Sequence, residues 1–93
     1  MTVRYRARAL ADLEEIHRYL EPHSAIGART VLGAILNAIE QIEHDPFSGP
    51  PTSDPGLRVK VIGRYRYKVF YDVIEPGTIE IVHVRHTARR PWP

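Results

Sequence analysis

Hydrophobic residues recur with helical spacing in the first half of the chain. Between residues 9 and 20, and again from residue 24 to about residue 44, apolar side chains follow the i, i+3, i+4, i+7 spacing of an amphipathic helix. Ser24 is a suitable N-cap for the second helix. Glu21-Pro22 and Asp45-Pro46 end the two helices, because a residue before proline avoids the α-helical region. The pattern predicts an antiparallel helical hairpin.

Alternating apolar and polar residues predict four strands around this hairpin, at residues 2–6, 57–61, 65–73 and 79–85. The proline-rich stretch 45–56 is a loop, and Glu75-Pro76-Gly77-Thr78 has the order of a type II turn. The last strand is apolar on both faces, so it is expected to be central or to carry a bulge. The order β-α-α-β-β-β predicts an α+β fold in which the N-terminal helical hairpin packs on one face of a small antiparallel sheet.

Alternation also predicts which side chains share a face. One face of strand 65–73 is expected to join the core through Tyr65, Tyr67, Val69, Tyr71 and Val73. Its other face carries Arg66 and Lys68, together with Phe70 and Asp72. In strand 57–61 the basic residues alternate with the apolar ones, so they are expected to point outward. The hairpin then places four cations side by side: Arg58, Lys60, Arg66 and Lys68.

Composition narrows the class of protein. A chain of 93 residues is expected to form one domain, residues 1–93, with one core. The absence of cysteine excludes a disulfide framework and thiolate metal sites. Without a signal-peptide pattern or a long apolar run, the expected location is the cytoplasm. Residues 1–50 hold five Lys/Arg against seven Asp/Glu, whereas residues 51–93 hold eight against four. The second half is thus either a solvated basic face or a surface for an acidic partner.

Candidate chemistry is limited to cations and histidines. No Walker loop, GxGxxG, HExxH or GxSxG motif is present, and no cofactor is indicated. His83 and His86 are three apart on a strand and point to opposite faces, which disfavours a shared metal. Metal-free RNA cleavage needs a base, an acid and cations, and Lys60, Lys68, His83, His86 and Arg89 supply these types. The alternative hypothesis is pure binding, in which Arg85, Arg89 and Arg90 with Trp92 would contact a phosphate backbone or an acidic protein.

The ordered segments ALADLEEIHRYL, PGLRVKVIGRYRYKVFYDV and IEIVHVRHTARRP, with the long apolar helix between them, resemble the RelE/ParE superfamily of type II toxin–antitoxin toxins. The resemblance covers nearly the whole chain. It implies a cognate antitoxin as partner and one of two activities. RelE-like members cleave mRNA in the ribosomal A site, whereas ParE-like members poison DNA gyrase.

Some residues of the resemblance favour the RelE-like branch, and others favour the ParE-like branch. Arg58 and Lys60 match basic sheet positions of RelE-like toxins, and Lys68 matches an arginine that holds phosphate. The catalytic tyrosine has no counterpart in Arg90-Pro91-Trp92-Pro93, and His86 followed by Arg89 is similar to the ParE ending. The expected function is therefore gyrase poisoning. The alternative is a ribosome-dependent endoribonuclease with Lys60, Lys68 and Arg89 as catalytic residues. A third possibility is an inactive fold that only binds its antitoxin. The expected target-binding residues are Arg58, Lys60, Arg64, Arg66, Lys68, His86, Arg89 and Arg90.

Overall fold

A computed structural model of the chain describes residues 2–75 and 77–87. Its elements follow the expected order and confirm the α+β class: β1 (Thr2–Tyr5), α1 (Ala7–Leu20), α2 (Ala25–His44), β2 (Arg58–Ile62), β3 (Tyr67–Glu75) and β4 (Thr78–His86). Pro76 of the expected turn lies outside the described residues, as do Arg89, Arg90 and Trp92 of the expected binding tail.

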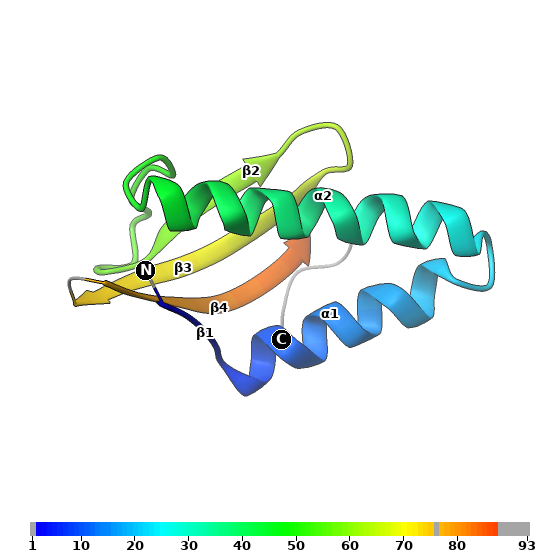
Figure 1. Cartoon of the computed structure of the whole chain (residues 1–93), viewed down its shortest axis with the longest axis horizontal. Helices are drawn as coiled ribbons and strands as arrows, with labels where there is room; N and C mark the ends of the chain where they lie inside the picture. The colour runs from blue at the N-terminus through cyan, green and yellow to red at the C-terminus, as the bar shows by residue number, and fades with distance from the viewer. Residues whose placement is uncertain (1, 76, 88–93) are drawn as a thin grey trace.

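The helices form the expected hairpin over one face of the sheet (Figure 1). Ser24 is the N-cap of α2, because its Oγ accepts a hydrogen bond from the Gly27 N–H at 2.9 Å. The first helix begins at Ala7, two residues before the apolar pattern predicts. Helix α1 packs over β4, and α2 packs over β2 and β3. No helix in the described part of the chain is long and apolar enough to cross a membrane.

The sheet has the strand order β1-β4-β3-β2. Strands β2, β3 and β4 form the expected antiparallel meander, but β1 pairs with β4 in parallel, so the sheet is mixed. Both expectations for the last strand are confirmed. It is interior in the sheet, and the register shifts within it: Phe70 pairs with His83 and Tyr71 with Ile81, which leaves Val82 as the extra residue of a bulge.

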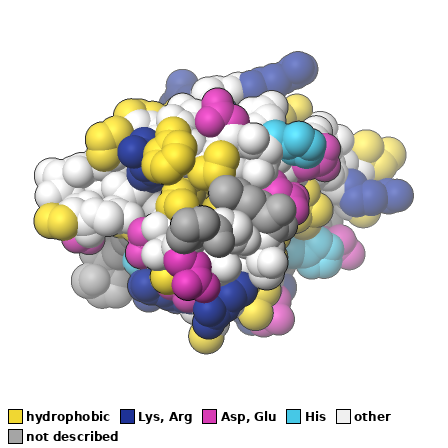
Figure 2. Space-filling model, turned by 60° about the vertical axis from the view of Figure 1, so that its left-hand side comes forward, with side chains coloured by type: hydrophobic (Ala, Val, Ile, Leu, Met, Phe, Trp, Pro, Cys, Tyr) yellow, Lys and Arg dark blue, Asp and Glu magenta, His cyan; other side chains and the backbone are white. Residues whose placement is uncertain are grey.

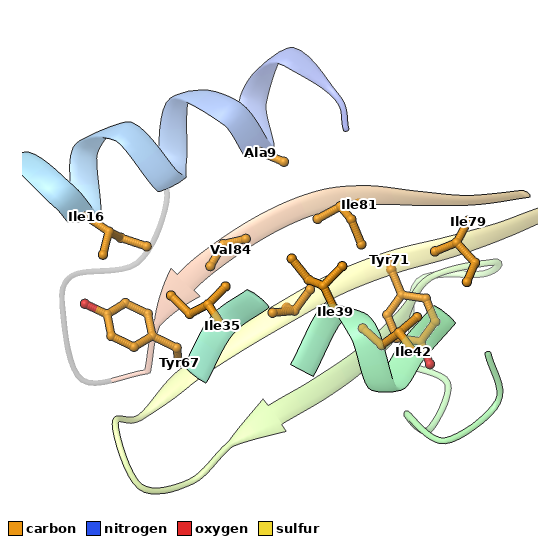
Figure 3. Packing of buried hydrophobic residues seen from close by; sticks show 11 residues of the cluster. Ala9, Ile16, Ile35, Ile39, Ile42, Tyr67, Tyr71, Ile79, Ile81 and Val84 are labelled. Carbon is orange, nitrogen blue, oxygen red and sulfur yellow. The ribbon is translucent and has the colours of Figure 1, made fainter. Parts of the chain in front are cut away.

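The core lies between the helices and the covered face of the sheet (Figure 3). Ile35, Ile39 and Ile42 of α2 point toward strand residues that include Tyr71 and Ile81. Each of these isoleucines is at most 4% exposed, and burial of such a side chain contributes about 1.5–3 kcal/mol to folding. The periodic apolar stripe of α2 is therefore what fixes the helix to the sheet.

One polar side chain is buried beside β4 where β4 extends beyond the end of β1. Strand β1 ends at Tyr5, opposite Ile81, while β4 continues for five more residues. Beyond that point the carboxylate of Asp12, from α1, accepts the backbone N–H of Val84 at 3.0 Å. Asp12 is only 9% exposed, and Arg8 Nε donates to its other oxygen at 3.2 Å. Helix α1 thus supplies a hydrogen-bond acceptor that a strand would otherwise supply.

Candidate functional site

The expected four-cation patch does not form, because β2 lies in the opposite register from the predicted one. Arg58 pairs with Tyr71, and Lys60 pairs with Val69, so both cations share the face that the helices cover. Lys68 pairs with Val61 and lies on the open face. Directly paired residues of antiparallel strands point to the same side. The basic residues of β2 and the lysine of β3 are therefore separated by the thickness of the sheet.

Arg66 does not belong to either face. Strand β3 begins at Tyr67, and Arg66 lies in the preceding turn with a φ of 61°. This left-handed conformation is uncommon for a residue with a Cβ. The turn is held by backbone hydrogen bonds from Arg66 N–H to Gly63 C=O at 3.3 Å and from Thr87 N–H to Arg66 C=O at 2.7 Å. Arg64, in the same turn, lies over the ring of Tyr65 at 5.6 Å.

The two cations of β2 hold the loop that follows α2. Arg58 donates from Nη1 to the carbonyl of Gly49 at 2.8 Å, and its guanidinium lies 4.8 Å from the ring centroid of Phe47. Lys60 Nζ lies 3.4 Å from Ser48 Oγ. These contacts give both cations a structural role in fixing residues 46–49 against the sheet. These contacts could not be predicted from the sequence, because the 46–49 loop is irregular and shows no periodic pattern.

The side chain of Tyr71 also holds the 46–49 loop. Its hydroxyl donates to the carbonyl of Pro46 at 2.7 Å and accepts from the N–H of Gly49 at 3.0 Å. Burial raises the pKa of Tyr71 above 10.0, and this effect outweighs the opposing hydrogen bond with Gly49 and the charge of Arg58. The hydroxyl therefore stays protonated and able to donate. Sequence reasoning assigned Tyr71 to the core but missed this polar role.

The open face of the sheet carries charges of both signs. Lys68 lies opposite Arg85 at one end, and Asp72 lies opposite Glu80 at the other. Arg6 forms an ion pair with Glu80 at 2.6 Å. On the end of the molecule that Figure 2 turns toward the viewer, basic side chains are likewise interrupted by hydrophobic and acidic ones. Lys68 and Arg85 are two basic residues paired across the strands at one end of this face, and we call them the open-face pair.

The two histidines of β4 point to opposite faces, as predicted. His86 packs edge-to-face on Tyr67 of the covered face, with ring centroids 4.9 Å apart. His83 packs on Phe70 of the open face at 6.4 Å. They do not share a metal site, and no group of three or more potential metal ligands occurs within residues 2–75 and 77–87. Arg89 and Arg90 of the predicted site lie outside the described residues.

His83 predicts a dependence of stability on pH. Burial lowers its pKa below the ordinary 6.5, the charges of Arg8, Arg6 and Arg85 act in the same direction, and Asp12 opposes them. Because the folded pKa is below the unfolded one, the unfolded chain binds a proton first as the pH falls. The free energy of unfolding is therefore expected to decrease as the pH falls below 6.5, the ordinary pKa of histidine. The decrease ends once the pH is below the pKa of His83 in the folded protein. Urea unfolding at several pH values checks this, and His83→Gln should flatten the profile. An unchanged slope in the variant contradicts the assignment.

Comparison with known proteins identifies the family. Residues 3–91 match the family described as "ParE toxin of type II toxin-antitoxin system, parDE". The chain belongs to the ParE toxin family. Membership implies a cognate antitoxin. The chain is also 31% identical over 91 residues to the "Putative toxin Y4kP" of Sinorhizobium fredii strain NBRC 101917 / NGR234, with 98% of this chain and 92% of that protein covered.

Two solved structures share the ParE-family fold. One is a chain of the chromosomal ParDE toxin–antitoxin system from P. aeruginosa, with a TM-score of 0.69 and 21% identity, covering 92% of this chain and 95% of that chain. The other is the isolated E. coli RelE toxin, with a TM-score of 0.63 and 12% identity, covering 95% and 85%. At these identities the likeness concerns the fold alone.

Proposed function

We propose that this ParE-family chain arrests growth by binding and poisoning DNA gyrase in the cytoplasm, and that its cognate antitoxin neutralises it. The family match over residues 3–91 supports this function. The observation that carries the choice of binding over catalysis is the separation of Lys60 from Lys68 on opposite faces of the sheet. A nuclease that uses both lysines needs their ammonium groups at one phosphate. The register of β2 and β3 keeps them apart.

The open-face pair is the proposed basic part of the target-binding surface. Lys68 and Arg85 face each other across β3 and β4, although like charges in that position disfavour the sheet. A negatively charged partner removes this repulsion when it binds. Arg58 and Lys60 lie on the covered side and hold the 46–49 loop. We therefore place the target on the open face rather than on β2.

The experiment pairs two assays on the purified full-length chain. Gyrase supercoiling of plasmid DNA is expected to be inhibited, and mRNA on programmed ribosomes is expected to stay intact. Cleaved mRNA with unaffected gyrase establishes the endoribonuclease alternative and contradicts the proposal. Growth that continues normally after induction of the chain alone contradicts both activities and indicates the inactive fold.

Lys68→Glu tests the surface itself. It is expected to raise the concentration needed for gyrase inhibition at least tenfold, because it reverses one charge of the open-face pair. The fold should persist, since glutamate opposite Arg85 forms an opposite-charge cross-strand pair. Arg29→Glu, on the exposed side of α2, makes the same change in net charge and should leave inhibition unchanged. Equal potency of the two variants places the target elsewhere.

A further inference from the structure

The open face of the sheet changes the sign of its charge from one end to the other. Both helices pack on the opposite face (Figure 1). Along β3 and β4 a basic pair, an aromatic pair and an acidic pair follow one another: Lys68–Arg85, Phe70–His83 and Asp72–Glu80. Val61, which pairs with Lys68 from β2, adds an apolar side chain that is 54% exposed. The face therefore combines charged ends with apolar surface.

A rotation relates the two charged ends. Phe70 is midway between Lys68 and Asp72, which are four residues apart on β3, a separation of about 13 Å. Imagine a two-fold axis parallel to the sheet and perpendicular to the strands, passing over Phe70. It brings the basic end of one copy over the acidic end of the other. In such a contact the same surface is used by both copies, so each interaction is made twice.

The basic end extends beyond the open-face pair. Arg64 and Arg66 lie in the turn that precedes β3, and both are exposed. The acidic end is only partly neutralised. Arg4 pairs with Glu80 across the sheet, and Arg6 Nε lies 2.6 Å from Glu80 Oε1. These two arginines face three carboxylates, because Asp54 lies close to Asp72 and Glu80 at this end.

A hollow beside Asp72 fits the side chain that the rotation brings to it. Its volume is about 240 Å³, and Asp54, Leu57 and Val82 are among the residues that line it. Lys68 of a second copy can place its aliphatic stem on the two apolar side chains and its ammonium between the carboxylates. Arg6, which also lines the hollow, has its charge paired with Glu80.

We propose that two copies of the chain associate through their open faces, with Lys68 of each copy against Asp72 of the other. Arg85 and Glu80 form the corresponding contact on β4. Each like-charged cross-strand pair then meets a pair of opposite charge. The dimer covers the open-face pair. On the proposed function, on which this consequence alone rests, self-association masks the target-binding surface, and only the single chain is active.

Other partners fit the full length of the face less well. A nucleic acid that ran along the strands from the basic end would meet the carboxylates of Asp54 and Asp72, which repel its phosphates. A protein partner can match either end. Only a second copy necessarily carries the same spacing of charges in the reverse direction.

Sedimentation velocity of the purified full-length chain at a series of concentrations tests the interface. We expect a reversible monomer–dimer equilibrium that weakens as salt is added. Lys68→Glu and Asp72→Lys are each expected to weaken association at least tenfold, because each places like charges at two contacts of the dimer. Both variants should fold, since each new side chain lies opposite a residue of the other charge, Arg85 or Glu80. Circular dichroism checks this.

A mixture of the two variants is the sharpest sample. In the mixed dimer the glutamate introduced at position 68 lies against the lysine introduced at position 72. The native Lys68 and Asp72 form the other contact. The two variants should therefore associate with each other, although neither associates with itself. Arg29→Glu, on the exposed side of α2, matches the net-charge change of Lys68→Glu and should leave self-association unchanged.

Three outcomes overturn the interface: a chain that stays monomeric at every concentration, a dimer that both variants leave intact, or a mixture that does not associate. Gyrase assays test the masking. Asp72→Lys keeps the open-face pair and should inhibit supercoiling, and added Lys68→Glu should suppress this inhibition. Undiminished inhibition in a mixture that associates overturns the masking. If wild type leaves gyrase unaffected while association follows the expected pattern, the proposed function fails and the interface stands.

Discussion

Gly49→Ala is expected to lower the free energy of unfolding by about 3–5 kcal/mol, combining the cost of overpacking with the loss of two hydrogen bonds. A Cβ at this position would lie 2.5 Å from the Val59 carbonyl oxygen and 2.7 Å from the Tyr71 hydroxyl. Neither neighbour is the end of a flexible chain, so the loop must move. That movement weakens the hydrogen bonds that Gly49 makes with Tyr71 and Arg58.

Gly33→Ala is the matched control for this change. An added Cβ at Gly33 meets nothing within 4 Å, and the residue lies inside α2. Alanine there should raise stability by about 0.8–1 kcal/mol, the difference in helix propensity. Urea unfolding followed by far-ultraviolet circular dichroism measures both variants. If the two alanines change the midpoint by similar amounts, the loop is not as closely packed as described.

Asp12→Ala is expected to cost about 2–4 kcal/mol, because it removes a charged acceptor and leaves the buried N–H of Val84 without one. The edge of β4 beyond β1 then has no substitute for the missing strand at this point. Native-state hydrogen exchange should show faster exchange at the Val84 amide, in addition to a lower global stability. An unchanged exchange rate would show that the Asp12 carboxylate does not protect this amide.

Asp12→Asn separates the hydrogen bond from the charge. The amide oxygen still accepts from Val84, so the variant should lose less stability than Asp12→Ala. The ion pair with Arg8 is lost in both variants. If Asp12→Asn is as destabilising as Asp12→Ala, the interaction with Arg8 rather than the capping of β4 provides the stability.

The sequence predicted the helices well because their signal is local. The apolar stripe of α2 and the cap at Ser24 both depend on residues within a few positions of each other. The interior position of β4 was predicted from its apolar residues on both faces, and the structure confirms it. These features can be predicted without knowing how the rest of the chain folds.

The faces of β2 were predicted wrongly because alternation defines two faces without saying which one is covered. Val59 and Val61 look like the inward set, yet Arg58 and Lys60 share the face of Tyr71 and Val69. At the edge of the sheet, cations can contact a loop while their aliphatic stems cover apolar surface. The partners that make this possible, Ser48 and Gly49, come from an irregular loop whose path carries no periodic signal.

The strand that joins the two sides of the sheet is also the last of its four strands in the described part of the chain. Strand β4 joins β1, at residues 2–5, to β3, so the pairing that places the N-terminus depends on residues 78–86. A chain released before Thr78 has no partner for β1 and no second neighbour for β3. Incomplete products of synthesis therefore lack both the finished sheet and the open-face pair, and only a chain translated through β4 can present the surface proposed to stop growth.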